Sequence, residues 1–142
     1  MNWSSPNGRA PTHAADRRNA FCALAPSPAS PGLARDFVAE QIKDWANAER
    51  RDDVALVASE LVTNAVRHGQ CDLELIVEVT QDHVRLEVID GSTHPFEFAN
   101  SRPARDGGWG LNIVAQVADA WGLEQRRDQK HVWCELRDNL IV

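Results

Sequence analysis

The clearest structural signal in the sequence is a helical pattern of apolar residues between Asp53 and Gly69. Its apolar positions recur at i, i+3, i+4, i+7, i+8 and i+11, the spacing of one continuous stripe along an α-helix. The stripe consists of Val54, Val57, Ala58, Leu61, Val62 and Ala65. We therefore expect a helix that faces a hydrophobic core, with Asp52 or Asp53 as its amino-terminal cap and Gly69 as the residue that ends it.

Polar residues border this stripe. Glu60 and Asn64 lie one helical turn apart, where a side chain is half sheltered and can still reach a ligand. Arg67 and His68 follow one turn later. On the helix alone a structural explanation suffices, since Glu is a good helix former and Asn can simply be solvated.

Length, charge and cysteine content limit the class of protein. A chain of 142 residues is long enough for one domain with a core and too short for two ordinary ones. The net charge of −6 argues against a nucleic-acid partner. Cys22, Cys71 and Cys134 are widely separated, so they indicate neither a zinc site nor a disulfide framework. No apolar window approaches ~20 residues and no hydrophobic leader is present, so we expect no membrane association and a cytoplasmic location.

The amino-terminal part predicts a tail, a strand and a helix. Residues 1–18 have almost nothing to bury and are expected to be disordered, which leaves residues 19–142 as the folded domain. Residues 19–24 can form a first strand. Ser30 as cap and Pro31 at the first helical position predict a helix that ends near residues 47–51. Its apolar side would contain Ala34, Phe37, Val38, Ile42 and Trp45.

A hairpin and a long loop follow the Asp53–Gly69 stretch. Residues 73–80 and 83–89 are rich in Val, Ile and Leu, and the second run alternates apolar and charged residues. They predict two strands joined at residues 81–82. Residues 90–108 have no periodicity, and loops of this length often act as lids over a site.

The last third predicts one more helix and a closing hairpin. The helix stripe contains Leu111, Val114, Val117, Ala118 and Trp121. Gly122 would end this helix, and residues 123–127 and 130–137 would pair around residues 128–129. The order of elements predicts an α+β fold, with helices on one face of a mixed, mainly antiparallel sheet.

Two glycine-containing segments are candidates for a ligand site. Asp90-Gly91 ends a predicted strand with an acidic residue followed by a residue without a Cβ, where a ligand can approach the backbone. The segment Gly107-Gly108-Trp109-Gly110-Leu111 precedes a helix, where backbone N–H groups and the helix dipole favour phosphate. Taken alone, the first is more often a turn, and the second is a flexible loop as often as a phosphate cradle.

The segment Ser59-Glu60-Leu61-Val62-Thr63-Asn64-Ala65-Val66-Arg67-His68-Gly69 resembles the N-box helix of the Bergerat-fold ATPases, which include gyrase, Hsp90, histidine kinases and MutL. Within that superfamily the chain looks most like the small anti-sigma-factor serine kinases and their single-domain actinobacterial relatives. The resemblance extends over residues 21–137 and includes the Asp90 and Gly108 segments in the same order. It implies a Bergerat-type two-layer sandwich that binds ATP and Mg²⁺.

The resemblance also implies roles for individual residues. Asn64 would ligate magnesium, and Glu60 would act as the catalytic base. The remaining nucleotide contacts would come from Arg67, His68, Asp90, Gly91, Gly108, Trp109, Gly110 and Leu111. Asp90 would accept a hydrogen bond from the adenine amino group, and the Gly108–Leu111 segment would contact phosphate. The chain departs from the family pattern at Ser92 and His94, where later glycines are usual, and at His131, which replaces a small hydroxyl residue.

Two functions agree with this pattern. The first is an anti-sigma-type serine/threonine protein kinase that phosphorylates an antagonist protein and so regulates transcription by partner switching. The second is a nucleotide-gated binding module that sequesters a sigma factor or antagonist without phosphotransfer, which the departures at Ser92 and His94 motivate. An isolated histidine-kinase catalytic domain is a third alternative, but no phosphoacceptor helix pair precedes the domain. Family analogy suggests a homodimer.

Overall fold

The computed structural model describes residues 17–68, 71–91 and 109–138. Three helices and five strands lie in this part of the chain, in the order β1 (Arg18–Leu24), α2 (Ser30–Gln41), α3 (Ala48–His68), β2 (Leu73–Val79), β3 (His83–Asp90), α4 (Trp109–Val117), β4 (Ala120–Arg126) and β5 (Gln129–Arg137). Most of the predicted tail, and the predicted loop beyond Gly91, lie outside the described residues.

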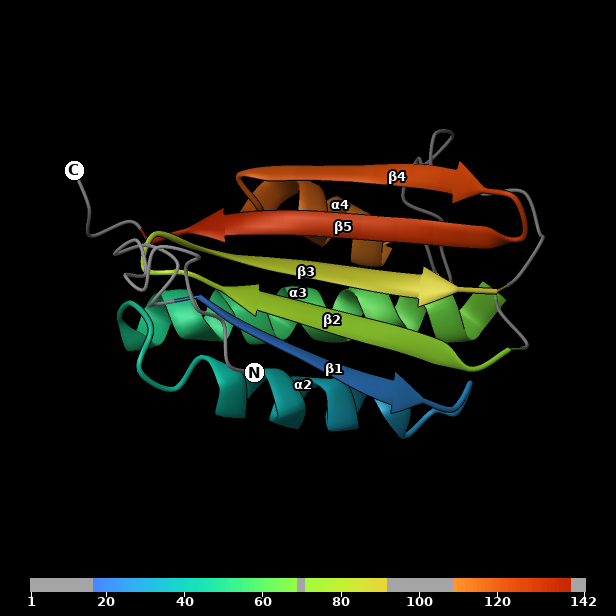
Figure 1. The fold of residues 1–142 in the computed structure, drawn as a ribbon, viewed down its shortest axis with the longest axis horizontal. Helices are drawn as coiled ribbons and strands as arrows, with labels where there is room; N and C mark the ends of the chain where they lie inside the picture. Colours follow the sequence, from blue (N-terminus) through green and yellow to red (C-terminus); the bar gives the residue numbers. More distant parts are fainter. Residues whose placement is uncertain (1–16, 69–70, 92–108, 139–142) are drawn as a thin grey trace, which may run out of the picture.

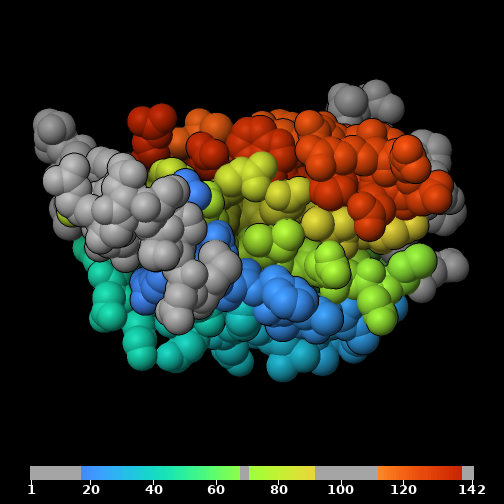
Figure 2. Space-filling view, in the orientation of Figure 1, coloured from blue at the N-terminus to red at the C-terminus, as the bar shows by residue number. Residues whose placement is uncertain are grey.

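The strands form one sheet in the order β1-β2-β3-β5-β4, and every neighbouring pair is antiparallel. All three helices lie behind the same face of this sheet, and α3 crosses behind its centre (Figure 1). The opposite face is formed by side chains of the strands, and no helix of the described residues crosses it (Figure 2). This confirms the predicted α+β fold with helices on one face, in a sheet that is antiparallel throughout its described strands.

The core lies between the sheet and α3, as the helical stripe of α3 and the alternating pattern of β3 predict. On β3, Val84, Leu86 and Val88 are buried and alternate with half-buried residues that point to the open face. All six members of the predicted α3 stripe are buried. Each fully buried Val or Leu contributes roughly 1.5–3 kcal/mol relative to an exposed side chain, so this layer dominates the stability of the fold.

Helix α3 starts earlier than predicted, at Ala48. Its first turn is capped by Asn47, whose Oδ1 accepts a hydrogen bond of 2.8 Å from the backbone N–H of Arg50. The prediction of Asp52 or Asp53 as the cap was therefore wrong. Both lie inside the helix, and the Asp53 carboxylate instead binds the Arg50 guanidinium at 3.0 Å.

Both ends of helix α2 also differ from the prediction. Ser30 is the first helical residue rather than the cap, because its Oγ donates a hydrogen bond of 2.6 Å to the carbonyl oxygen of Ala25. The helix ends at Gln41, and Ile42 and Trp45 remain buried in the turn that follows it. The apolar side was predicted correctly, but it continues past the end of the helix.

The last helix is shorter than predicted. Helix α4 ends at Val117, and Trp121 and Gly122 belong to strand β4. A Cβ on Gly122 would lie 2.7 Å from the ring of Trp133 on the neighbouring strand. The glycine is therefore needed for close packing against Trp133, and it does not end the helix.

The Arg50 side chain links the start of α3 to neighbouring elements. Its guanidinium is buried and donates to Asp119 Oδ2 at 2.7 Å and to the carbonyl oxygen of Arg137 at 2.8 Å. Asp119 Oδ2 also accepts from the backbone N–H of Arg137 at 2.6 Å. These contacts hold the start of α3, the segment before β4 and the end of β5 together.

None of the described helices has the length and apolar content that a membrane span requires.

Candidate functional site

The residues that resemble a nucleotide site meet at one end of the molecule. The carboxyl end of α3, the end of β3, the start of α4 and the start of β5 all lie at this end (Figure 1). These elements are far apart in the sequence, and the antiparallel order β3-β5 brings the last residue of β3 opposite the start of β5. The fold therefore assembles one polar cluster from four separate segments.

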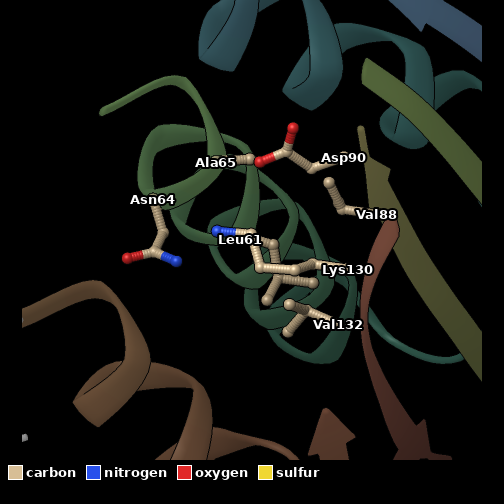
Figure 3. Close-up of a pocket in the computed structure, with 7 residues that line it drawn as sticks. All are labelled: Leu61, Asn64, Ala65, Val88, Asp90, Lys130 and Val132. Carbon is tan, nitrogen blue, oxygen red and sulfur yellow. The ribbon is translucent and has the colours of Figure 1, made fainter. Parts of the chain in front are cut away.

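A small cavity lies at this end, between α3 and the sheet. Its volume is ≈ 20 Å³, and it is lined by Leu61, Asn64, Ala65, Val88, Asp90, Lys130 and Val132 (Figure 3). One water molecule needs roughly 10–15 Å³, whereas small-molecule pockets are usually about 300–1,000 Å³. The cavity as it stands has room for about one water molecule, and a nucleotide base enters only if a lining side chain moves.

Asp90 supplies the acidic group of this cavity. It is the last residue of β3 and is 4% exposed. Its side chain points toward α3 near Ala65 (Figure 3). The following Gly91 is half-buried, and a Cβ there would meet its nearest described neighbour, the Cβ of Cys71, at 3.7 Å, which is an ordinary contact. Packing against the described residues therefore does not require glycine at this position.

Asn64 and Glu60 lie on α3 as predicted, one turn apart and both half-buried. Asn64 lines the cavity with Asp90, whereas Glu60 lies outside its lining. Arg67 is exposed near the end of α3, and the side chain of His68 is outside the described residues. The structure thus brings Asn64 and Asp90 to one cavity and leaves Glu60 and Arg67 beside it on the same helix.

The predicted phosphate segment is described in part. Trp109, Gly110 and Leu111 form the first turn of α4, and Gly108 lies outside the described residues. The free N–H groups of a first helical turn and the helix dipole favour an anion. Helices α3 and α4 are in contact, so this turn belongs to the same end of the fold as Asn64.

Lys130 was not among the predicted site residues, and His131, where the sequence departs from the family pattern, lies on the other face of the sheet. Lys130 is 4% exposed, lines the cavity and lies directly opposite Asp90 in the β3–β5 register. His131 points to the open face, where its Nδ1 lies 2.7 Å from Oε2 of Glu87. The alternation that buries Val132 on the helix side also places Lys130 on that side, so the β5 pattern could have identified it.

Glu87 forms a closed charge cluster on that open face. Arg85 donates to its carboxylate at 2.8 Å, and His131 binds the other oxygen. Burial acts to raise the pKa of Glu87, but the hydrogen bonds and charges of Arg85 and His131 outweigh it and hold the pKa below its ordinary value. The Arg85 guanidinium also lies over the Trp133 ring, 5.1 Å from its centroid. This cluster uses its polar groups internally and contributes none to the cavity.

Comparison with known proteins identifies the family. The sequence model of the histidine kinase-like ATPase domain matches residues 24–135. The chain belongs to this family. The match includes all the residues that line the cavity, and membership of the histidine kinase-like ATPase family implies ATP binding.

A solved structure supports the same fold. The chain is similar to the RsbU and RsbW domains of Rv1364c from Mycobacterium tuberculosis, with 19% sequence identity and a TM-score of 0.66. The similarity covers 91% of this chain and 33% of that one, so the chain spans about a third of that protein. At this identity the likeness shows the fold alone. Comparison with curated protein sequences finds no match.

Proposed function

We propose that this histidine kinase-like ATPase domain is an anti-sigma-type serine/threonine protein kinase. It transfers phosphate from ATP to a Ser or Thr of an antagonist protein and regulates transcription by partner switching. The observation that carries the proposal is the meeting of Asp90 and Asn64 at one cavity, within a chain whose sequence belongs to an ATPase family. The protein partners are the antagonist and a sigma factor, and the active form is a homodimer.

Asp90 recognises the adenine base. A carboxylate only accepts hydrogen bonds, so it fits the exocyclic amino group of adenine and not the oxygen that guanine presents at the same place. The burial of Asp90 strengthens this preference, because a mismatched polar group in a dry site is costly. Gly91 lets the base approach the backbone next to it.

Asn64 holds the magnesium ion that accompanies ATP. The donor set fits this hard cation, which accepts a carboxamide oxygen and completes its shell with waters and phosphate oxygens. Among the described residues, no group of three or more His, Cys, Asp or Glu side chains could hold a metal. When bound, magnesium neutralises charge on the phosphates.

Glu60 acts as the general base, one turn before Asn64 on α3. It takes the proton of the attacking Ser or Thr hydroxyl when the antagonist lies in line with the terminal phosphate. The phosphate chain is bound by Gly108 and the first turn of α4, at Trp109, Gly110 and Leu111. Arg67 and His68, at the end of α3, add positive charge beside the phosphates.

A nucleotide-gated binding module is the second candidate. Ser92 and His94 stand where the family pattern usually has glycines, and the cavity must open before a base can enter. A protein of this kind would bind ATP and sequester a sigma factor or antagonist without transferring phosphate.

Incubation of the purified chain with γ-labelled ATP, magnesium and antagonist proteins encoded in the same genome tests the proposal. Transfer of label to a serine or threonine of an antagonist is the expected result, with Glu60→Gln as the inactive control. Tight antagonist binding without transfer would favour the binding module. Failure of the wild-type chain to bind ATP at all would contradict both candidates.

A further inference from the structure

Lys130 is a buried cation in the cavity for which the proposed kinase mechanism has no role. Lys130 is one of only two lysines in the chain, and it is 4% exposed. Lysine is rarely buried to this degree, because desolvation of an ammonium group is costly unless the site gives it negative or polar partners. Its position therefore needs an explanation beyond packing.

The pairing of β3 with β5 places Lys130 next to Asp90. It is the Cα partner of Asp90, and both side chains lie on the helix side of the sheet. From β5, the Lys130 side chain crosses toward α3, and its nitrogen lies near Leu61 on the side of the cavity where Asn64 is found (Figure 3). The Lys130 ammonium group is thus directed toward the side of Asn64, the residue proposed to bind magnesium, and away from Asp90, the residue proposed to bind adenine.

The cavity volume requires a side chain to move. About 20 Å³ admits a water molecule and excludes a base. Four of the lining residues, Leu61, Ala65, Val88 and Val132, are buried apolar side chains of the core. Lys130 has the longest and most flexible stem of the lining set, and its head group can rotate away while the stem stays in place.

We propose that Lys130 is a nucleotide-binding residue whose ammonium group leaves the base cavity when nucleotide binds and then donates to the phosphate chain. This inference rests on the proposed ATP site and adds a cation to it that neither the family motifs nor the sequence pattern assigned. Asp90 and Lys130 supply opposite charges to the same cavity. With nucleotide present, the adenine amino group donates to Asp90, and the phosphates beside Asn64 become the partner of the Lys130 ammonium group.

The affinity test compares ADP with adenosine, which has the same base and no phosphate. Lys130→Met keeps the length of the side chain and removes its charge, and we expect ADP binding to weaken about 10-fold, as for the loss of one charge-assisted hydrogen bond. Adenosine should change by less than about 3-fold, since its base contacts remain. Lys130→Arg should restore most of the ADP affinity. Lys43→Met is the matched control, because Lys43 lies in the turn after α2 and its side chain is 62% exposed.

A chemical test uses the same pair of lysines. An acyl-phosphate derivative of ADP acylates amines that lie beside its phosphates, and peptide mass spectrometry can score both lysines in one sample. We expect acylation at Lys130 that excess ADP blocks, and any acylation of Lys43 to be insensitive to ADP.

The results distinguish a failure of the proposed Lys130 contact from a failure of the ATP site. If wild type binds ADP but Lys130→Met weakens ADP and adenosine equally, or weakens neither, the phosphate contact is overturned. Absence of ADP-sensitive acylation at Lys130 would also overturn it. If the wild-type chain does not bind ADP, the ATP site itself fails. Thermal unfolding of each variant shows whether an affinity loss reflects misfolding.

Discussion

Strands β3 and β5 carry two charged clusters, one on each face of the sheet, and the two behave differently. On the open face, Glu87 receives hydrogen bonds from Arg85 and His131, so its acceptors are used within the fold. On the helix face, Asp90 and Lys130 lie opposite each other and line a cavity with Asn64. The outer cluster is closed on itself, whereas the inner one borders a space that a ligand can enlarge.

The difference shows how strand alternation separates stability from function over a few residues. Neighbouring positions on β5 point to opposite faces, so His131 contributes a hydrogen bond to Glu87 while Lys130 lines the cavity. We therefore expect substitutions of the polar residues at the cavity to change ligand binding or catalysis with less effect on folding. Substitutions on the outer face should do the reverse.

Glu60→Gln should give the largest effect on the inner side. The amide keeps the shape and hydrogen-bonding reach of Glu60 but cannot accept a proton as a base. We expect phosphotransfer to an antagonist to fall by ~10²-fold or more, with ATP affinity and unfolding midpoint near the wild-type values. Single-turnover transfer of label measures it. Wild-type transfer rates in this variant would reduce Glu60 to a helix-face carboxylate.

Asp90→Asn should weaken adenine nucleotides by roughly 10-fold or more, because it removes a charge-assisted hydrogen bond at a buried site. The preference for ATP over GTP should also shrink, since an amide can donate to the guanine oxygen. Titration calorimetry with both nucleotides gives the two affinities. Unchanged values for ATP and GTP would mean that Asp90 only ends the strand.

Much of this inner face could be predicted from sequence, and the reasons for the misses are physical. The periodicity of α3 placed Asn64 at the border of the core, and the alternation of β3 placed Asp90 at the end of a buried strand. Helix ends were less accurate. Asn47 caps α3, Asp53 binds Arg50, and Ser30 binds the Ala25 carbonyl oxygen. Helix propensity alone does not reveal these contacts.

Two further errors depend on contacts between strands. Gly122 looks like a helix stop in the sequence, but it lies in β4, where the Trp133 ring occupies the space that a Cβ would fill. The alternation of β5 indicates the face on which Lys130 lies, but its position opposite Asp90 follows from the register. Neither partner can be identified until the strand order is known.

Asn64→Ala should remove most of the magnesium dependence of ATP binding. Asn64 is the only protein ligand assigned to the ion, and we expect an affinity loss of up to about 10-fold in magnesium, with little change in chelator. Calorimetric titration with and without magnesium checks this. The assignment fails if the wild-type chain binds ATP equally well in chelator.

Glu87→Gln, on the outer face, should give the smallest effect and the opposite pattern. The lowered pKa of Glu87 means that its charged form is stabilised by folding, so its contribution is fully present above the ordinary pKa of 4.5 and is lost as pH falls through the lowered folded value. At neutral pH the variant should lose about 1 kcal/mol of unfolding free energy, typical of one net hydrogen bond, and bind ADP as wild type does.

Urea denaturation of wild type and Glu87→Gln at several pH values tests the predicted stability loss and its pH dependence. Groups that titrate in both proteins cancel in the difference between the two unfolding free energies. The stability difference should narrow below pH 4.5, the ordinary pKa of Glu87. Glu124→Gln is the matched control on the same face, since the Glu124 side chain is 51% exposed and its ion pair with Arg126 should be worth less than about 1 kcal/mol. A difference that stays constant down to low pH would show that Glu87 acts through packing. Weakened ADP binding in Glu87→Gln would show that the two faces are coupled, and the separation drawn between them would then be wrong.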